Sequence, residues 1–124
     1  MTNLIITAAV GLNIKQVDFF LKTLRKYYSD EVLILIGNND QKLKHSLSKY
    51  NCKFFEIKTH RFDVQLQRYE IYLKLLKKEK FNKILCCDCR DIYFQSNPFN
   101  FDYKGEINFF LEDKKIKDCK YNSN

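Results

Sequence analysis

Two aspartates and an arginine come directly after an apolar run in the second half of the chain. The run is Ile84–Cys87, and Asp88, Arg90 and Asp91 follow it. Carboxylate oxygens bind hard divalent cations, and a guanidinium pairs with phosphate or carboxylate oxygens. We expect Ile84–Cys87 to form a buried strand, so that the charged residues lie at its exit. Aspartates also stabilise turns, so a purely structural role for Asp88 and Asp91, with Arg90 holding the turn, stays open.

Short apolar runs separated by polar segments predict the strands of a sheet. The runs place strands near residues 3–9, 32–36, 53–57 and 83–87, and "INFFLED", residues 107–113, predicts a fifth. The runs are continuous, without period-2 alternation, which is typical of parallel strands covered on both faces.

Helical periodicity fills the segments between these strands. Asn13, with Gln16 three residues later, fits a capping box at the start of a first helix. The second helix should bury Leu43 and Leu47. A third helix should direct one apolar stripe to the core, formed by Phe62, Leu66, Tyr69, Leu73 and Leu76.

Strands that alternate with helices predict one α/β domain over residues 1–124, a Rossmann-like parallel sheet with helices on both faces. Right-handed crossovers give the strand order 3-2-1-4. The order reverses between the first and fourth strands, and such sheets bind ligands at this point, beyond the carboxyl ends of the strands. The loop Ala8–Asn13 and the charged cluster Asp88–Asp91 should both lie there.

Phosphate would need an unusual partner in this crevice. The three glycines, Gly11, Gly37 and Gly105, are far apart, so neither a dinucleotide fingerprint nor a P-loop is present. A divalent metal on the carboxylates, assisted by arginine, is the substitute that the sequence offers.

The sequence resembles the nucleotide-sugar glycosyltransferases of the GT-A class. "KILCCDCRDIYFQSNPF" is similar to the family's apolar strand, D-x-D-like acidic cluster and Pro-Phe turn, and Arg68 lies one helix ahead of it, as in many members. "INFFLED" and the later "CKYNSN" resemble the next strand and a Cys-x-x-Asn segment. One departure is the spacing of the acidic cluster, because Cys89 and Arg90 separate Asp88 from Asp91 where the family has Asp-x-Asp.

The resemblance implies a GT-A fold that binds a nucleotide-diphosphate sugar and transfers the sugar to an acceptor. The metal would be Mn²⁺ or Mg²⁺ on Asp88 and Asp91. The implied donor-binding residues are Thr7, Ala8, Ala9, Asn13, Arg68, Asp88 and Arg90. The chain corresponds to the donor-binding half of such enzymes, so we expect a missing or separate C-terminal half. The alternative is a non-catalytic Rossmann-like module that binds a nucleotide or a protein partner.

The composition limits which binding partners and which cellular compartment we expect. The net charge is +7, but the lysines cluster in "KLLKKEKFNK" without a nucleic-acid-binding motif, so nucleic acid is not the expected partner. No window approaches the roughly 18 apolar residues of a membrane span. The five cysteines include three in four positions, Cys86, Cys87 and Cys89, which does not suit a disulfide framework. We expect reduced thiols without metal, and therefore a cytoplasmic protein.

Overall fold

A four-stranded parallel sheet forms the centre of the protein, seen here in a computed structural model that describes residues 2–58, 64–90 and 92–108, and only the backbone at 64–66. The strands are β1 (Leu4–Ala8), β2 (Glu31–Gly37), β3 (Lys53–Ile57) and β4 (Ile84–Cys86). Their order is β3-β2-β1-β4, and each neighbouring pair is parallel. The predicted Rossmann-like α/β arrangement and strand order are therefore confirmed.

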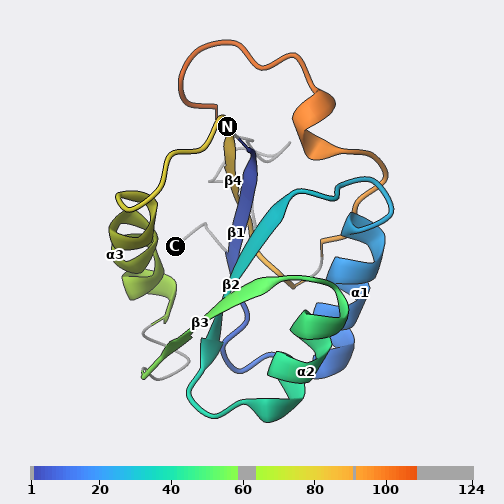
Figure 1. Ribbon diagram of the computed structural model, residues 1–124, viewed down its shortest axis with the longest axis vertical. Coiled ribbons are helices and arrows are strands. Elements are labelled where there is room, and N and C mark those ends of the chain that lie inside the picture. The colour runs from blue at the N-terminus through green and yellow to red at the C-terminus, as the bar shows by residue number, and fades with distance from the viewer. Residues whose placement is uncertain (1, 59–63, 91, 109–124) are drawn as a thin grey trace, which may run out of the picture.

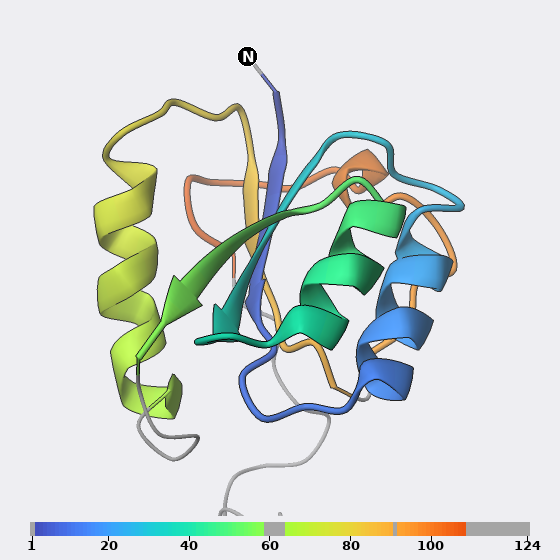
Figure 2. The same cartoon turned by 60° about the horizontal axis from the view of Figure 1, so that its bottom comes forward.

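Helices cover both faces of the sheet, as the sequence predicted (Figure 1). Helices α1 (Ile14–Leu24) and α2 (Gln41–Lys49) lie on one face, and α3 (Val64–Leu76) lies on the other. The turned view separates the three layers, with the sheet between α3 and the α1–α2 pair (Figure 2). A short 3₁₀ helix, η1 (Pro98–Asn100), follows β4.

Alternating side chains of the strands fill two buried layers. Ile5 on β1 and Ile34 on β2 pack against α1 and α2, together with Phe20, Leu24 and Leu47. The layer beneath α3 contains Leu4, Ile6, Leu35, Ile57 and Tyr72. Both faces of β1 and β2 are therefore apolar, which explains why these strands read as continuous apolar runs.

The start of α1 is the capping box that the sequence predicted. The backbone N–H of Gln16 donates to Asn13 Oδ1 at 3.0 Å, and the backbone N–H of Asn13 donates to Gln16 Oε1 at 3.2 Å. These two bonds satisfy N–H groups that a helix end leaves without intrahelical partners. Gly11, with a φ of 76°, makes the turn between β1 and this cap.

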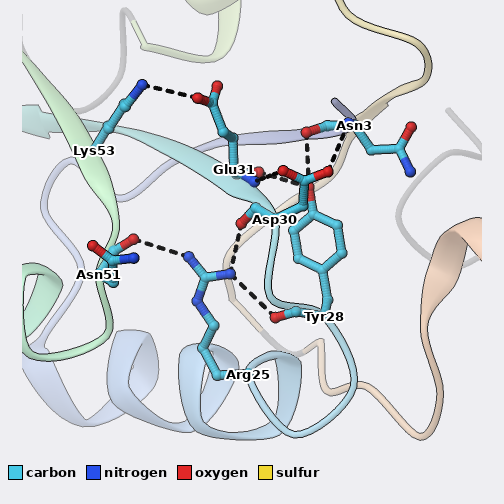
Figure 3. A network of polar contacts seen from close by, with 7 residues as sticks. All are labelled: Asn3, Arg25, Tyr28, Asp30, Glu31, Asn51 and Lys53. Carbon is cyan, nitrogen blue, oxygen red and sulfur yellow. Dashed lines mark hydrogen bonds and ion pairs between the residues drawn. The ribbon is translucent and has the colours of Figure 1, made fainter. Parts of the chain in front are cut away.

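Arg25, the C-cap of α1, joins the carbonyl groups of two loops (Figure 3). Its Nη1 donates to the carbonyl oxygens of Tyr28 and Asp30, at 3.1 and 2.7 Å. Its Nε and Nη2 donate to the carbonyl oxygens of Tyr50 and Asn51, at 2.9 and 3.0 Å. One guanidinium therefore holds the α1–β2 loop against the α2–β3 loop.

The same region fixes the start of β1 against the start of β2. The hydroxyl of Tyr28 lies 3.0 and 2.8 Å from the carbonyl oxygens of Asn3 and Glu31, which share its single proton. The carboxylate of Asp30 accepts from the backbone N–H groups of the same two residues. Lys53 at the start of β3 adds an ion pair with Glu31, at 3.0 Å.

The prediction that Ile84–Cys87 is a buried run was wrong. Ile84 is 42 % exposed, Cys86 is exposed, and Leu85 and Cys87 are only partly buried. Strand β4 pairs with β1 alone among the described strands, so it stands at the edge of the four-stranded sheet. Helix α3 packs over β1 more than over this edge, which leaves the β4 side chains on that face half covered.

The predicted core stripe of α3 was also wrong at two of its positions, while Phe62 and the side chain of Leu66 lie outside what the structure describes. Tyr69 and Leu73 are both 56 % exposed, whereas Tyr72 is buried and Ile71, Leu75 and Leu76 pack on its layer. The helix is rotated so that Arg68 and Tyr72, one turn apart, face the sheet. Of the predicted fifth strand, residues 109–113 lie outside the described residues. No helix in the described part of the chain is long and apolar enough to cross a bilayer.

Candidate functional site

A cleft lies between α3 and the end of β4, and we call it the α3–β4 cleft. Its volume is about 260 Å³, and it is lined by Arg68, Tyr69, Tyr72, Cys86, Cys87 and Asp88. Three of these residues come from one turn of α3, and the others end or follow β4. Because β4 runs parallel to β1, the cleft opens at the carboxyl end of the sheet.

An ion pair joins the two sides of the cleft. Arg68 Nη1 donates to Asp88 Oδ1 at 2.8 Å, across 20 residues of sequence. The side chain of Arg68 is 14 % exposed and that of Asp88 is 63 % exposed, so the arginine lies inside and the carboxylate at the mouth. Both residues were predicted site residues, and the structure brings them together.

Tyr69 contacts the guanidinium of Arg68 through a nitrogen that Asp88 does not use. Arg68 Nη2 donates to the Tyr69 hydroxyl at 2.9 Å, and the guanidinium carbon lies 4.8 Å from the centre of the Tyr69 ring. Burial lowers the pKa of Arg68, but the hydrogen bond to Asp88 and the nearby negative charge outweigh it, and the pKa is raised. The arginine is therefore a permanent cation with a fixed orientation.

Tyr72 forms the floor of the cleft. It is 3 % exposed, and its ring meets that of Tyr69 edge to face with centres 5.8 Å apart. Burial raises the pKa of its hydroxyl well above the ordinary value, although the charge of Arg68 opposes this shift. The pattern in the sequence that points to Tyr72 is its position four residues after Arg68, because side chains four apart lie on the same face of a helix.

The thiols of Cys86, Cys87 and Cys89, on β4 and directly after it, are neutral and form no disulfide with any described residue. Burial raises the pKa of Cys87 and of Cys89 to about 12. Desolvation also raises the pKa of Cys86, and Arg68 opposes this shift. The four cysteines within the described residues are free, and no three metal-ligating side chains gather there. Cys119 lies outside the described residues.

The predicted donor-binding residues at the end of β1 and in the segment after it have other surroundings. Thr7, Ala8, Ala9 and Asn13 are not among the residues that line the α3–β4 cleft. Thr7 and Ala9 are fully buried in the sheet and beneath α1, and Asn13 caps α1. Thr7 Oγ1 is buried and has no hydrogen-bond partner among the residues that the structure describes.

The residue between Asp88 and Arg90, Cys89, has a buried side chain. Cys89 is 2 % exposed and packs in the layer under α1, while Asp88 and Arg90 are exposed on either side of it. The chain then returns along α1, where the Phe94 backbone N–H donates to Thr23 Oγ1 at 3.1 Å. Asp91, the second predicted metal ligand, lies outside the described residues.

The chemistry of the site suits a hard cation held together with a ligand. The hydrogen bond from Arg68 uses Oδ1 of Asp88, and 63 % of the Asp88 side chain is exposed. Mg²⁺ typically binds one or two protein carboxylates and takes its remaining ligands from phosphates and water. Asp88 fits this mode of binding as a single carboxylate donor.

Comparison with protein-family models and with curated proteins finds no match for the chain.

Proposed function

We propose that the chain binds a nucleotide-diphosphate sugar through Mn²⁺ or Mg²⁺ and belongs to a glycosyltransferase of the GT-A class, which transfers the sugar to an acceptor. The observation that carries the proposal is the Arg68–Asp88 pair, 2.8 Å apart, beside a cleft at the carboxyl end of β4. The resemblance of the segment around Asp88 to the family's acidic cluster supports it.

The topology supports the position of this ligand. The chain places β2 and β3 on one side of β1 and β4 on the other, so the strand order reverses between β1 and β4. In open parallel sheets, ligands bind beyond the carboxyl ends of the strands at such a reversal. Asp88 follows β4 by two residues, at the end where this principle locates a ligand.

Each residue has a role in the proposed site. Asp88, with Asp91, holds the metal, and Arg68 orients Asp88 while its charge offsets that of the diphosphate. Arg90, Ala8 and Asn13, which are exposed or partly exposed, complete the donor site, whereas Thr7 and Ala9 are fully buried and offer no surface to the donor. The bound metal supplies positive charge that stabilises the leaving diphosphate.

A non-catalytic nucleotide-binding or protein-interaction module is the second candidate. The ion pair itself favours it, because Arg68 already neutralises Asp88 and gives the acidic turn a structural partner. In this case the carboxylate would hold α3 against β4 and bind no metal.

Calorimetric titration with uridine and guanosine diphosphates separates the two candidates. The titrations are run once with Mn²⁺ and once with a chelator. The proposal expects binding that depends on the metal, because the diphosphate and Asp88 repel each other without a cation. Equal affinity under both conditions would favour the non-catalytic module, and the absence of binding under both would refute the nucleotide ligand.

A further inference from the structure

Helix α3 has an exposed apolar side chain on its outer side as well as apolar side chains against the sheet. Ile71, Tyr72 and Leu75 pack in the layer between the helix and the sheet, whereas Leu73 is 56 % exposed. Figure 2 shows α3 as the outer layer on its side of the sheet, with no other described element over it. Packing against the sheet therefore does not account for Leu73.

Ile84, the first residue of β4, extends this apolar surface. Ile84 and Cys86 are two positions apart on a strand, so their side chains point to the same face of the sheet. Cys86 lines the α3–β4 cleft with Tyr69, and Leu73 follows Tyr69 by one helical turn. Helix α3 connects two parallel strands and so runs opposite to them, and one helical turn and two strand residues both span roughly 6 Å. Leu73 and Ile84, which is 42 % exposed, therefore lie at the same level beyond the cleft.

Exposed lysines accompany these two side chains. The segment 74–83 contains five of them: Lys74, Lys77, Lys78, Lys80 and Lys83. Against Glu70 and Glu79, the two acidic residues of segment 69–84, these lysines leave a net charge of +3. Among the described residues, no carboxylate forms an ion pair with any of the five. The backbone N–H of Lys77 donates to the carbonyl oxygen of Leu73 at 3.2 Å, so Lys77 lies one helical turn beyond Leu73 on the same side.

Lysines beside aliphatic side chains define the chemistry of the partner. A cluster of roughly four to eight basic residues on a helix is typical of binding to anionic lipids. Aliphatic side chains gain free energy by entering the boundary between head groups and acyl chains, while lysines reach the charged head groups around them. A nucleic acid would use the lysines and stacked aromatic rings, but not Leu73 or Ile84. An anionic lipid surface is the partner that fits both kinds of side chain.

We propose that Leu73, Ile84 and the five lysines, which we call the α3 lysine surface, bind an anionic lipid membrane. The two aliphatic side chains enter the head-group region, and the lysines contact the anionic head groups. Helix α3 lies along the membrane and keeps its inner side on the sheet. This contact goes beyond the proposed function, because it requires neither a nucleotide nor a metal.

Sedimentation of the whole chain with lipid vesicles measures this binding. One set of vesicles contains phosphatidylcholine alone, and the other contains phosphatidylcholine mixed with anionic phosphatidylserine. We expect the chain to sediment with the mixed vesicles and to stay in solution with phosphatidylcholine alone. Added salt should weaken the binding, because it screens the attraction between the lysines and the head groups.

The position of the charges is tested with two triple variants of equal net charge. Lys77→Gln, Lys78→Gln and Lys80→Gln, made together, remove three positive charges from the α3 lysine surface. Their combined effect should be a loss of affinity of about a hundredfold, because each lysine near an anionic membrane contributes about equally. The control makes the same exchange at three exposed lysines on the other face of the sheet, in α1 and directly after it, and should bind far more tightly: Lys15, Lys22 and Lys26.

The apolar part of the surface is tested with Leu73→Gln. Glutamine is as good a helix former as leucine, and position 73 is exposed, so the fold should be retained. The loss of an inserted aliphatic side chain should weaken binding by about tenfold or more. Phe19→Gln is the matched control, since Phe19 is 55 % exposed on α1, and it should bind like the wild type. Urea denaturation of each variant verifies that it is folded.

Four outcomes would overturn the inference. The first is no binding to the mixed vesicles, and the second is equal binding to both kinds of vesicle. The third is an equal loss in the two triple variants, which would assign the binding to the overall charge of +7. The fourth is a Leu73→Gln variant that binds like the wild type. If an RNA oligonucleotide of mixed sequence also bound through the same lysines in that case, the partner would be a nucleic acid.

Discussion

Arg68 Nη1 lies 2.8 Å from Asp88 Oδ1, and this contact ties the middle of α3 to the turn after β4. The two residues are unequally exposed, at 14 % for the arginine side chain and 63 % for the aspartate side chain. Water screens an ion pair that has one exposed partner, so this pair should contribute little to the stability of the fold. Its main effect is to fix the positions of Arg68 and Asp88 in the cleft.

A double-mutant cycle of Arg68→Gln and Asp88→Asn measures this energy. We expect a coupling free energy below about 1 kcal/mol, as for ion pairs with an exposed partner. Urea denaturation of the four proteins gives the values, and added salt should reduce the coupling further. A coupling of about 3 kcal/mol or more would show instead that the pair behaves as a buried one.

Arg25 should matter far more for stability than Arg68. Arg25→Ala removes the donor to four backbone carbonyls, those of Tyr28, Asp30, Tyr50 and Asn51. We expect a loss of about 2–4 kcal/mol in the free energy of unfolding, because carbonyls within the two loops lose their partner. Lys26→Ala, at the exposed neighbouring position, is the control and should change the stability by less than about 0.5 kcal/mol. Equal losses of stability in the two variants would show that Arg25 does not stabilise the fold by holding the two loops together.

The cysteines should react in an order set by burial. Cys86 is exposed, whereas Cys52 and Cys89 are buried and the pKa of Cys87 and of Cys89 is about 12. Iodoacetamide should therefore label Cys86 before the other three in the folded protein at mildly alkaline pH, since the thiolate is the reactive form. Peptide mapping by mass spectrometry gives the order. All five cysteines of the chain should react after denaturation, and a smaller number would reveal a disulfide or a bound metal.

The same thiols make the stability depend on pH in the alkaline range. The pKa of Cys87 and of Cys89 rises from 9.0 to about 12 in the folded state. Between these values the unfolded chain releases protons that the folded chain keeps, so the free energy of unfolding should fall as pH rises. Below this range the two thiols are protonated in both states and have no effect. Cys89→Ser should flatten the slope in urea denaturation at several pH values, and an unchanged slope would assign it to other groups.

The strand order and layers followed from the sequence because β1 and β2 are buried on both faces. Leu4, Ile6 and Leu35 face α3, while Ile5 and Ile34 face α1 and α2, so no alternation interrupts the apolar runs. The Asn13 cap also followed, because it depends only on residues three positions apart.

The orientation of α3 could not be predicted from the sequence, because apolar residues lie on more than one side of this helix. Tyr69 and Leu73 continued an apolar stripe in the sequence, yet Tyr72 and Arg68 face the sheet. The largely covered guanidinium of Arg68 departs from the usual rule that charged residues face water, and its hydrogen bonds to Asp88 and Tyr69 make this position favourable. No local pattern in the sequence distinguishes an arginine paired with Asp88 from a solvated one.

Asp88→Asn tests the proposed function with the least disturbance to the fold. The asparagine amide oxygen can still accept from Arg68 Nη1, so the contact between α3 and β4 is kept while the negative charge is lost. A hard divalent cation loses its anionic ligand, and we expect Mn²⁺-dependent binding of uridine or guanosine diphosphate to weaken by more than tenfold, about 1.4 kcal/mol. Asp91→Asn should have the same effect only if both carboxylates share the metal. Asp102→Asn, at another exposed aspartate after η1, is the matched control and should bind like the wild type. Calorimetry with Mn²⁺ and with chelator gives the affinities, and an unaffected Asp88→Asn would leave the acidic turn as a structural element of a non-catalytic module.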